Sequence, residues 1–171
     1  MTKFRQDAID EFNSLADHSD PLSTYRVTLE GSNTEDGREV FIGHITAQCY
    51  RCHSVSGSGG TAGPDLSKIA SPERKTDRRF LLESIMFPNA KISKGFATVS
   101  LVLESGKIIA GTIKSEDADS LTIVTNQNET ISMNRDEIEA KTITSSAMPD
   151  MIKLLSLHEI RDLVEYLSTL D

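Results

Sequence analysis

Apolar residues recur at two different spacings along the chain, and the change between them separates helical segments from strands. A spacing of three or four residues is typical of amphipathic helices. It predicts helices over residues 3–17, 34–47, 77–87 and 157–167. Ser156 and Glu159 have the spacing of a capping box, which marks the start of the last helix.

The second predicted helix contains a glycine near its start. Thr34 is expected to cap this helix, since its side-chain oxygen can accept a hydrogen bond from the first turn. Glycine inside a helix costs about 1 kcal/mol relative to alanine. Gly37 therefore predicts that another helix crosses very close to this one.

Between about residues 96 and 144 apolar and polar positions alternate, which is typical of strands with one buried face. The expected strands cover residues 97–103, 108–113, 121–124, 130–133 and 139–144. Several short strands at hairpin spacing predict a small antiparallel barrel or sandwich of the SH3-like or Sm-like kind. This β segment interrupts a helical chain, because helices are predicted on both sides of it.

Composition limits the core. The chain has 171 residues, which predicts one domain or two small ones. Only 5% of the residues are aromatic and none is Trp, so a large core must be aliphatic or must borrow apolar bulk from a group that is not protein.

The chain is acidic, with 18 Lys and Arg against 26 Asp and Glu and a formal net charge of −8. Nucleic acid and anionic lipid both need clustered basic residues, so neither is an expected partner. A protein partner with a basic face fits this charge. No apolar run is long enough to predict a membrane span, and the first residues lack the apolar core of a secretory signal.

The motif with the clearest chemistry is Cys49-Tyr50-Arg51-Cys52-His53, which holds both cysteines of the chain. This C-x-x-C-H pattern is typical of covalent haem c attachment. Two thiols three residues apart can reach the two vinyl groups on one edge of a porphyrin, and the following His supplies the proximal iron ligand. We therefore expect one haem c bound through Cys49 and Cys52, with His53 as a metal ligand.

Other uses of these cysteines and of the remaining histidines are less well supported. A structural zinc site needs four ligands, and His18, His44 and His158 are scattered; the last two are also weak rivals as iron ligands. A thioredoxin-like redox pair starts a helix in a βαβ unit, whereas a Ser- and Gly-rich loop over residues 54–66 follows this motif. A plain disulfide would leave His53 without a role.

A second axial ligand is commonly a Met thioether in electron-transfer haems. Met86 lies on an apolar helix face and Met133 in a predicted strand, and core packing explains both. Met148 lies in a polar loop braced by Pro149, where no core role is evident. Met151, three residues further on, remains a close competitor.

These residues resemble those of class I c-type cytochromes. The C-x-x-C-H motif matches the attachment site, and residues 63–66 resemble the loop whose proline carbonyl, here that of Pro64, accepts a hydrogen bond from the proximal His53. Gly37 and Phe41, set against Tyr166, resemble the packed crossing of the terminal helices.

The chain is still more similar to the haem-binding cytochrome domain family known from planctomycetes and verrucomicrobia. The resemblance covers about residues 34–170, and its motifs lie at residues 81–85, 88–90, 94–96, 106–107, 111–116, 147–149 and 160–167. It favours Met148 as the distal ligand. It also implies a mainly α, cytochrome c-like fold (α+β overall), interrupted by the β segment before the Met loop.

The resemblance implies three parts. Residues 1–33 would form an N-terminal helix and linker, residues 34–92 with 145–171 the cytochrome c haem domain, and residues 93–144 the inserted β domain. Members of the family often stand at the C-terminus of large secreted dehydrogenase-like proteins.

A haem with both axial positions filled has no place for a substrate, so the expected function is single-electron transfer between redox proteins and not catalysis. The alternative is a sensor or binding domain for CO or NO with a labile distal Met. Covalent haem attachment takes place outside the cytoplasmic membrane, so we expect a periplasmic or otherwise extracytoplasmic location and a chain that has lost its leader or is a fragment. The sequence leaves homodimerisation undecided.

Overall fold

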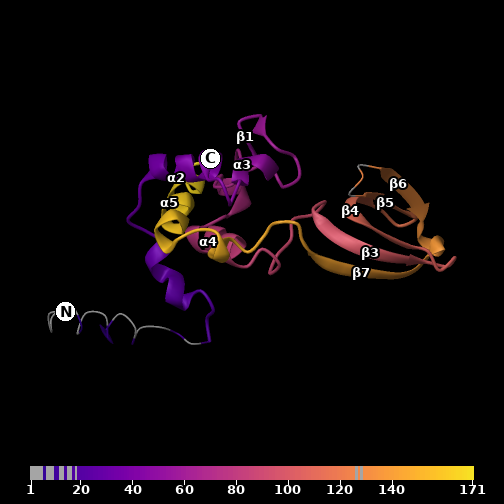
Figure 1. Ribbon diagram of the computed structural model, residues 1–171, viewed down its shortest axis with the longest axis horizontal. Coiled ribbons are helices and arrows are strands. Elements are labelled where there is room, and N and C mark those ends of the chain that lie inside the picture. Colours follow the sequence, from indigo (N-terminus) through magenta and orange to yellow (C-terminus); the bar gives the residue numbers. More distant parts are fainter. Residues whose placement is uncertain are drawn as a thin grey trace.

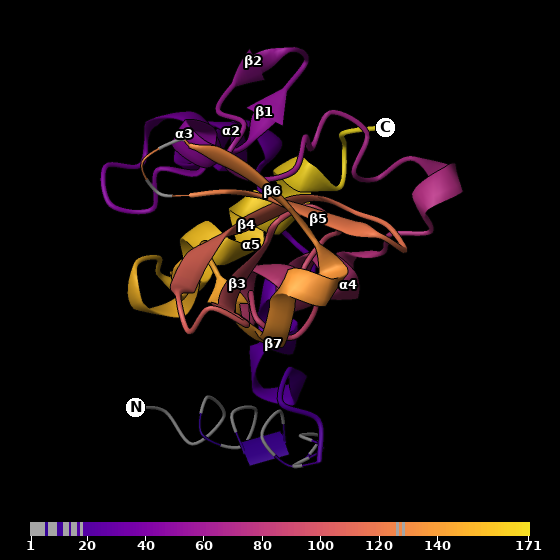
Figure 2. The ribbon, with the colours of Figure 1, turned by 90° about the vertical axis from the view of Figure 1, so that its right-hand side faces the viewer.

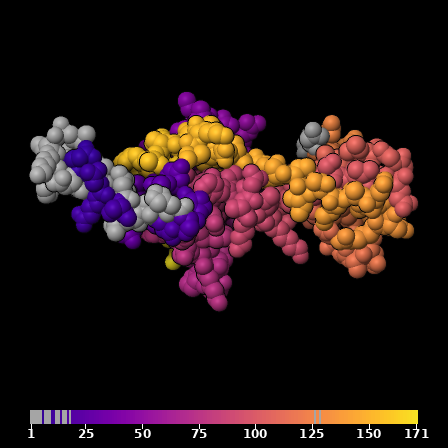
Figure 3. Space-filling model, turned by 90° about the horizontal axis from the view of Figure 1, so that it is seen from below, coloured from indigo at the N-terminus to yellow at the C-terminus, as the bar shows by residue number. Residues whose placement is uncertain are grey.

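Two separate hydrophobic clusters organise the computed structural model, which describes residues 6, 10–11, 14, 17, 19–125, 127 and 129–171. Helices surround one cluster and a β-sheet carries the other, with two chain segments joining them (Figure 1). Figure 3 shows the sheet at one end of the molecule. The helix predicted over residues 3–17 lies for the most part outside the described residues.

The first unit, called the helical unit below, consists of short helices and one small hairpin. Its α-helices are α2 (Thr34–Gly43), α3 (Cys49–Cys52), α4 (Arg78–Met86) and α5 (Leu157–Leu167). Its 3-10 helices are η1 (Ser23–Thr28), η2 (Pro72–Arg74) and η4 (Met151–Lys153), and its hairpin pairs β1 (Ser54–Val55) with β2 (Ser58–Gly59).

Side-chain caps fix where the longer helices begin. The capping box predicted at the start of α5 is present, with Ser156 and Glu159 each satisfying a backbone amide of the other residue. Asp77 caps α4, because its side chain accepts a hydrogen bond from the Phe80 amide. The prediction of Thr34 as the cap of α2 is wrong by one residue: Asn33 accepts that hydrogen bond, and Thr34 is already helical.

The predicted close crossing of helices at Gly37 is confirmed. Gly37 of α2 packs directly on α5, where a β-carbon at residue 37 would lie 2.6 Å from the Asp162 carbonyl carbon and 2.8 Å from Tyr166 Cβ. Phe41, one helical turn further along α2, is buried and its ring packs 5.6 Å from the ring of Tyr166. The absence of a side chain at Gly37 therefore allows the two helices to approach.

The second unit, called the sheet unit below, is a five-stranded antiparallel sheet with strand order β6-β5-β4-β3-β7. Its strands are β3 (Ala97–Leu103), β4 (Ile108–Glu116), β5 (Ser120–Val124), β6 (Thr130–Asn134) and β7 (Ile138–Ser146). The predicted strands are all present, and the α+β class is confirmed. Alternate residues face a small buried cluster of Val99, Leu101, Leu121, Ile123 and Met133.

The predicted barrel or sandwich is wrong, because the sheet is open. Closure would need hydrogen bonds between the outer strands, and within the described residues β6 pairs with β5 while β7 pairs with β3. The 3-10 helix η3 (Arg135–Glu137) carries the chain from one edge of the sheet to the other. Apolar alternation predicts the buried face of each strand, and it contains no information on whether the outer strands meet.

Candidate functional site

The two cysteines lie on one turn of helix. They are the first and last residues of α3, and residues three apart project from the same side of a helix. Gln48 before them has a left-handed backbone (φ 47°), which separates this turn from the preceding segment. Cys49 is buried in the helical unit, Cys52 is exposed, and both thiols are free.

A glycine-rich loop packs against the end of α3. Figure 2 shows its hairpin, β1 and β2, projecting from the helical unit beside α3. The amide of Gly60 donates to the Tyr50 carbonyl at 3.0 Å, and that of Gly63 donates to the Cys52 carbonyl at 2.7 Å. These bonds satisfy carbonyls that a helix end leaves without an internal partner. A β-carbon at Gly60 would overlap the backbone of Arg51, so the loop needs glycine here.

His53, directly after the turn, is held by the same loop. Its Nδ1 lies 2.8 Å from the Pro64 carbonyl oxygen, which is the hydrogen bond that the resemblance to class I c-type cytochromes implies. Gly63 lies against the ring, where a β-carbon would stand 2.6 Å from His53 Cε1. Since the Pro64 oxygen can only accept, Nδ1 carries the proton, and Nε2 is the ring nitrogen with a lone pair for a metal.

Burial shifts the pKa of His53 and of Cys49. It lowers the pKa of His53 below its ordinary value, and the hydrogen bond to Pro64 opposes this shift only in part. The imidazole is therefore neutral at neutral pH, the form in which His binds metals. Burial also raises the pKa of the Cys49 thiol to about 11.

This arrangement discriminates between the uses considered for the cysteines. A catalytic redox pair needs a thiol with a lowered pKa, and that of Cys49 is raised. Among the described residues no group of three His, Cys, Asp or Glu is arranged to hold a metal ion, which leaves a structural zinc site without its donors. Two free thiols on one helical turn, followed by a neutral and oriented imidazole, fit covalent attachment of a haem.

The methionine candidates differ in their surroundings. Met86 and Met151 are fully buried in the helical unit, and Met133 belongs to the buried cluster of the sheet. Met148 is half-buried in the loop between β7 and η4, where it packs against the hydrophobic cluster that includes Cys49. Of the methionines that the structure describes, the first three have clear packing roles.

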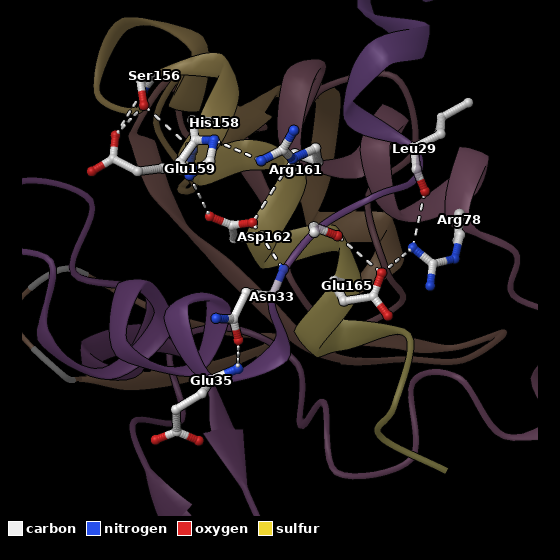
Figure 4. Close-up of polar contacts among 11 residues, drawn as sticks. Leu29, Asn33, Glu35, Arg78, Ser156, His158, Glu159, Arg161, Asp162 and Glu165 are labelled. Atoms are coloured by element: carbon white, nitrogen blue, oxygen red, sulfur yellow. Dashed lines mark hydrogen bonds and ion pairs between the residues drawn. The ribbon is translucent and has the colours of Figure 1, made fainter.

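His44 and His158, the other histidines considered as iron ligands, contact protein groups away from α3. Both line a groove of about 600 Å³ between α2 and α5. His44 Nδ1 accepts a hydrogen bond from the Ala47 amide, and its Nε2 lies 3.3 Å from Glu159. His158 contacts Arg161 through Nδ1 and Asp162 through Nε2, as Figure 4 shows. Both nitrogens of each ring thus already have protein partners.

The contacts of Gly60 and Gly63 with the site were not predicted from the sequence. It predicted an irregular loop after His53 and did not predict that Gly60 and Gly63 lie against the backbone of α3 and the ring of His53. The signal was the density of glycine in this loop. Which glycine approaches which neighbour depends on the folded path of the chain.

No helix in the described part of the chain is both long and apolar enough to cross a membrane. Comparison with protein families and with curated proteins finds no match to this chain, so the geometry around α3 and His53 carries the functional argument.

Proposed function

We propose that this chain is a c-type cytochrome domain that carries single electrons between redox proteins. One observation supports this proposal above the others: His53 follows two free thiols on one helical turn and has its Nδ1 fixed by the Pro64 carbonyl. In this proposal the helical unit is a cytochrome c-like fold made of residues 34–92 and 145–171. The sheet unit, within residues 93–144, is an insertion.

Cys49 and Cys52 would hold one haem c through thioether bonds. Cys49 is buried and Cys52 is exposed, so the group that they would hold would lie at the surface of the helical unit. The scarcity of aromatic residues agrees with this proposal, since an inserted haem supplies apolar bulk that the side chains lack.

His53 would bind the iron through Nε2. The Pro64 carbonyl prevents rotation of the ring and, by accepting a hydrogen bond from Nδ1–H, makes Nε2 a stronger electron-pair donor to a metal. Gly63 lies against the ring without a side chain that would push it out of place. The lowered pKa keeps His53 unprotonated and ready to bind.

Met148 would supply the second protein ligand of the iron. A haem iron held by His and Met exchanges one electron at a higher reduction potential than a haem iron held by two His. Among the described methionines of the helical unit, Met148 is the one that is only partly buried and lies in a loop, so its thioether is available without taking a core side chain away. If His53 and Met148 both bound the iron, no position on it would be open to a substrate, and the group would supply electron transfer and not catalysis.

The net charge of −8 favours a redox partner with a basic docking face and a complex that weakens as salt is added. Because covalent haem attachment occurs outside the cytoplasmic membrane, the proposed location is extracytoplasmic.

Spectroelectrochemistry of the chain produced in a host that matures haem c tests this function. The expected result is a reversible one-electron couple, with a Met–iron charge-transfer band in the oxidised form and slow CO binding to the reduced form. High-spin spectra with rapid CO binding would contradict electron transfer and favour a gas-binding domain.

A further inference from the structure

Two chain segments join the helical unit to the sheet unit. The one that carries Met148 is hydrogen-bonded to the other, which runs from α4 to β3 and contains Asn89. The amide of Ser146, the last residue of β7, donates to Asn89 Oδ1 at 2.7 Å. The amide of Met148 in turn donates to the Ser146 hydroxyl at 3.1 Å. Asn89 is therefore connected to the Met148 backbone through a single intervening residue, although the two are far apart in the sequence.

Asn89 is itself held by the helical unit. It follows α4, which is anchored by buried residues such as Leu82 and Met86. After the helix the chain turns tightly, because the amide of Ala90 donates to the Phe87 carbonyl at 2.8 Å. Asn89 is thus placed by α4 and by the turn that follows this helix.

Ser146 lies at the junction of the two units. In the sheet it pairs with Ala97 of β3. Toward the helical unit its amide donates a hydrogen bond to Asn89. A register shift separates this pair from the next one along β3 and β7, so the ladder is irregular where the Met148 loop begins. The hydrogen bond that the Ser146 amide donates to Asn89 Oδ1 adds a second support at that point.

We infer that Asn89 is a positioning residue for Met148, fixing the start of its loop on the helical unit. This inference rests on the proposed function, in which Met148 and His53 would both bind the iron. Without the Asn89 side chain, the start of the Met148 loop loses its hydrogen bond to the segment after α4, while Met148 keeps its packing on the hydrophobic cluster of the helical unit. The thioether then competes less well for the iron with a ligand added from solution.

Two measurements on the haem-bound chain test this role. The first is amide hydrogen exchange of the segment around residues 145–150, where Asn89→Ala exposes the Ser146 amide. The second is titration of the oxidised protein with imidazole, which displaces a weakly held Met. One hydrogen bond contributes about 1 kcal/mol, so Asn89→Ala is expected to raise the apparent imidazole affinity about fivefold, since 1.36 kcal/mol corresponds to a factor of ten.

Two further variants separate positioning from general destabilisation. Asn89→Asp keeps an oxygen that can accept from Ser146 and is expected to restore both exchange protection and imidazole affinity. Asn134→Ala, at the end of β6, removes an asparagine with a different contact, to Glu137, and is expected to change neither.

The outcomes are distinguishable. A wild-type chain without a Met–iron band would contradict the proposed function and the inference together. A wild-type chain with the band, but with equal imidazole affinity in Asn89→Ala, would overturn the inference alone. Equal effects of Asn89→Ala and Asn89→Asp, or of Asn134→Ala, would also overturn it.

Discussion

Gly37 of α2 and Asp162 of α5 are packed backbone to backbone, so that a β-carbon at residue 37 would lie 2.6 Å from the Asp162 carbonyl carbon. The obstructing atoms belong to the main chain and cannot rotate away. This crossing joins a helix from the first part of the chain to its last helix, and it holds the helical unit together around Phe41.

The crossing predicts opposite effects for two glycines of α2. Gly37→Ala forces the helices apart and is expected to lower the free energy of unfolding by about 2 kcal/mol or more, even though Ala is the better helix former. Gly43→Ala, with no atom within 4 Å of the new β-carbon, is the matched control and is expected to be neutral or slightly stabilising. Denaturant unfolding measures both, and equal behaviour of the two variants would contradict this account of the packing.

Gly63 gives a prediction for the proposed haem site. Gly63→Ala places a β-carbon 2.6 Å from His53 Cε1, so the ring must move and its hydrogen bond to Pro64 weakens. Protons then compete better for the imidazole, and the low-spin spectrum is expected to be lost at a higher pH during acid titration. Thr61→Ala, an exposed neighbour in the same loop, should leave the midpoint unchanged. An unchanged midpoint in Gly63→Ala would show that the ring is not held from this side.

Substitution of Met148 and of Met151 distinguishes the proposed iron ligand from a methionine that only packs in the core. Met148→Ala is expected to abolish the Met–iron band, to lower the reduction potential relative to a His/Met haem, and to allow fast CO binding. Met151→Leu exchanges one buried side chain for another of similar volume, which usually costs less than about 1.5 kcal/mol, and should leave the spectrum unchanged. Loss of the band in Met151→Leu alone would assign the ligand to Met151 instead.

The ion pair between Arg78 and Glu165 predicts part of the dependence of stability on pH. Arg78 Nη1 lies 2.7 Å from Glu165 Oε2 and also donates to the Leu29 carbonyl, as Figure 4 shows. The hydrogen bond from Arg78, aided by one from Ser32, lowers the pKa of Glu165 below its ordinary value of 4.5. The folded state therefore binds its proton less readily than the unfolded state does.

This contribution to stability is complete above the ordinary pKa and is lost as the pH falls from 4.5 through the lowered folded value. Glu165→Gln removes the titrating group, so the difference in melting temperature between wild type and variant is expected to shrink as the solution is acidified. A constant difference across the acid range would mean that the pair does not titrate on unfolding.

Local elements followed well from the sequence. Alternation of apolar positions predicted the strands of the sheet, and the spacing of Ser156 and Glu159 predicted the start of α5, because these signals act between near neighbours. Gly37 predicted a tertiary contact, since a glycine within a helix has a cost that close packing explains. In the site, the spacing from Cys49 to His53 was informative for the same local reason.

Features that depend on distant parts of the chain did not follow from the sequence. The open edges of the sheet depend on the path of the chain through η3, which no periodicity encodes. The contact of Gly63 with His53 and the link from Asn89 to Ser146 depend on how loops close over helices. An asparagine or a serine in a loop has many local uses, so its residue type alone does not identify its partner.

Intact-mass and peptide mass spectrometry of the chain from a haem c-maturing host tests the central claim most directly. The account predicts that the denatured protein keeps the mass of one haem, located on the peptide that contains Cys49 and Cys52. A protein of unmodified mass, or one whose two thiols are joined to each other, would contradict it.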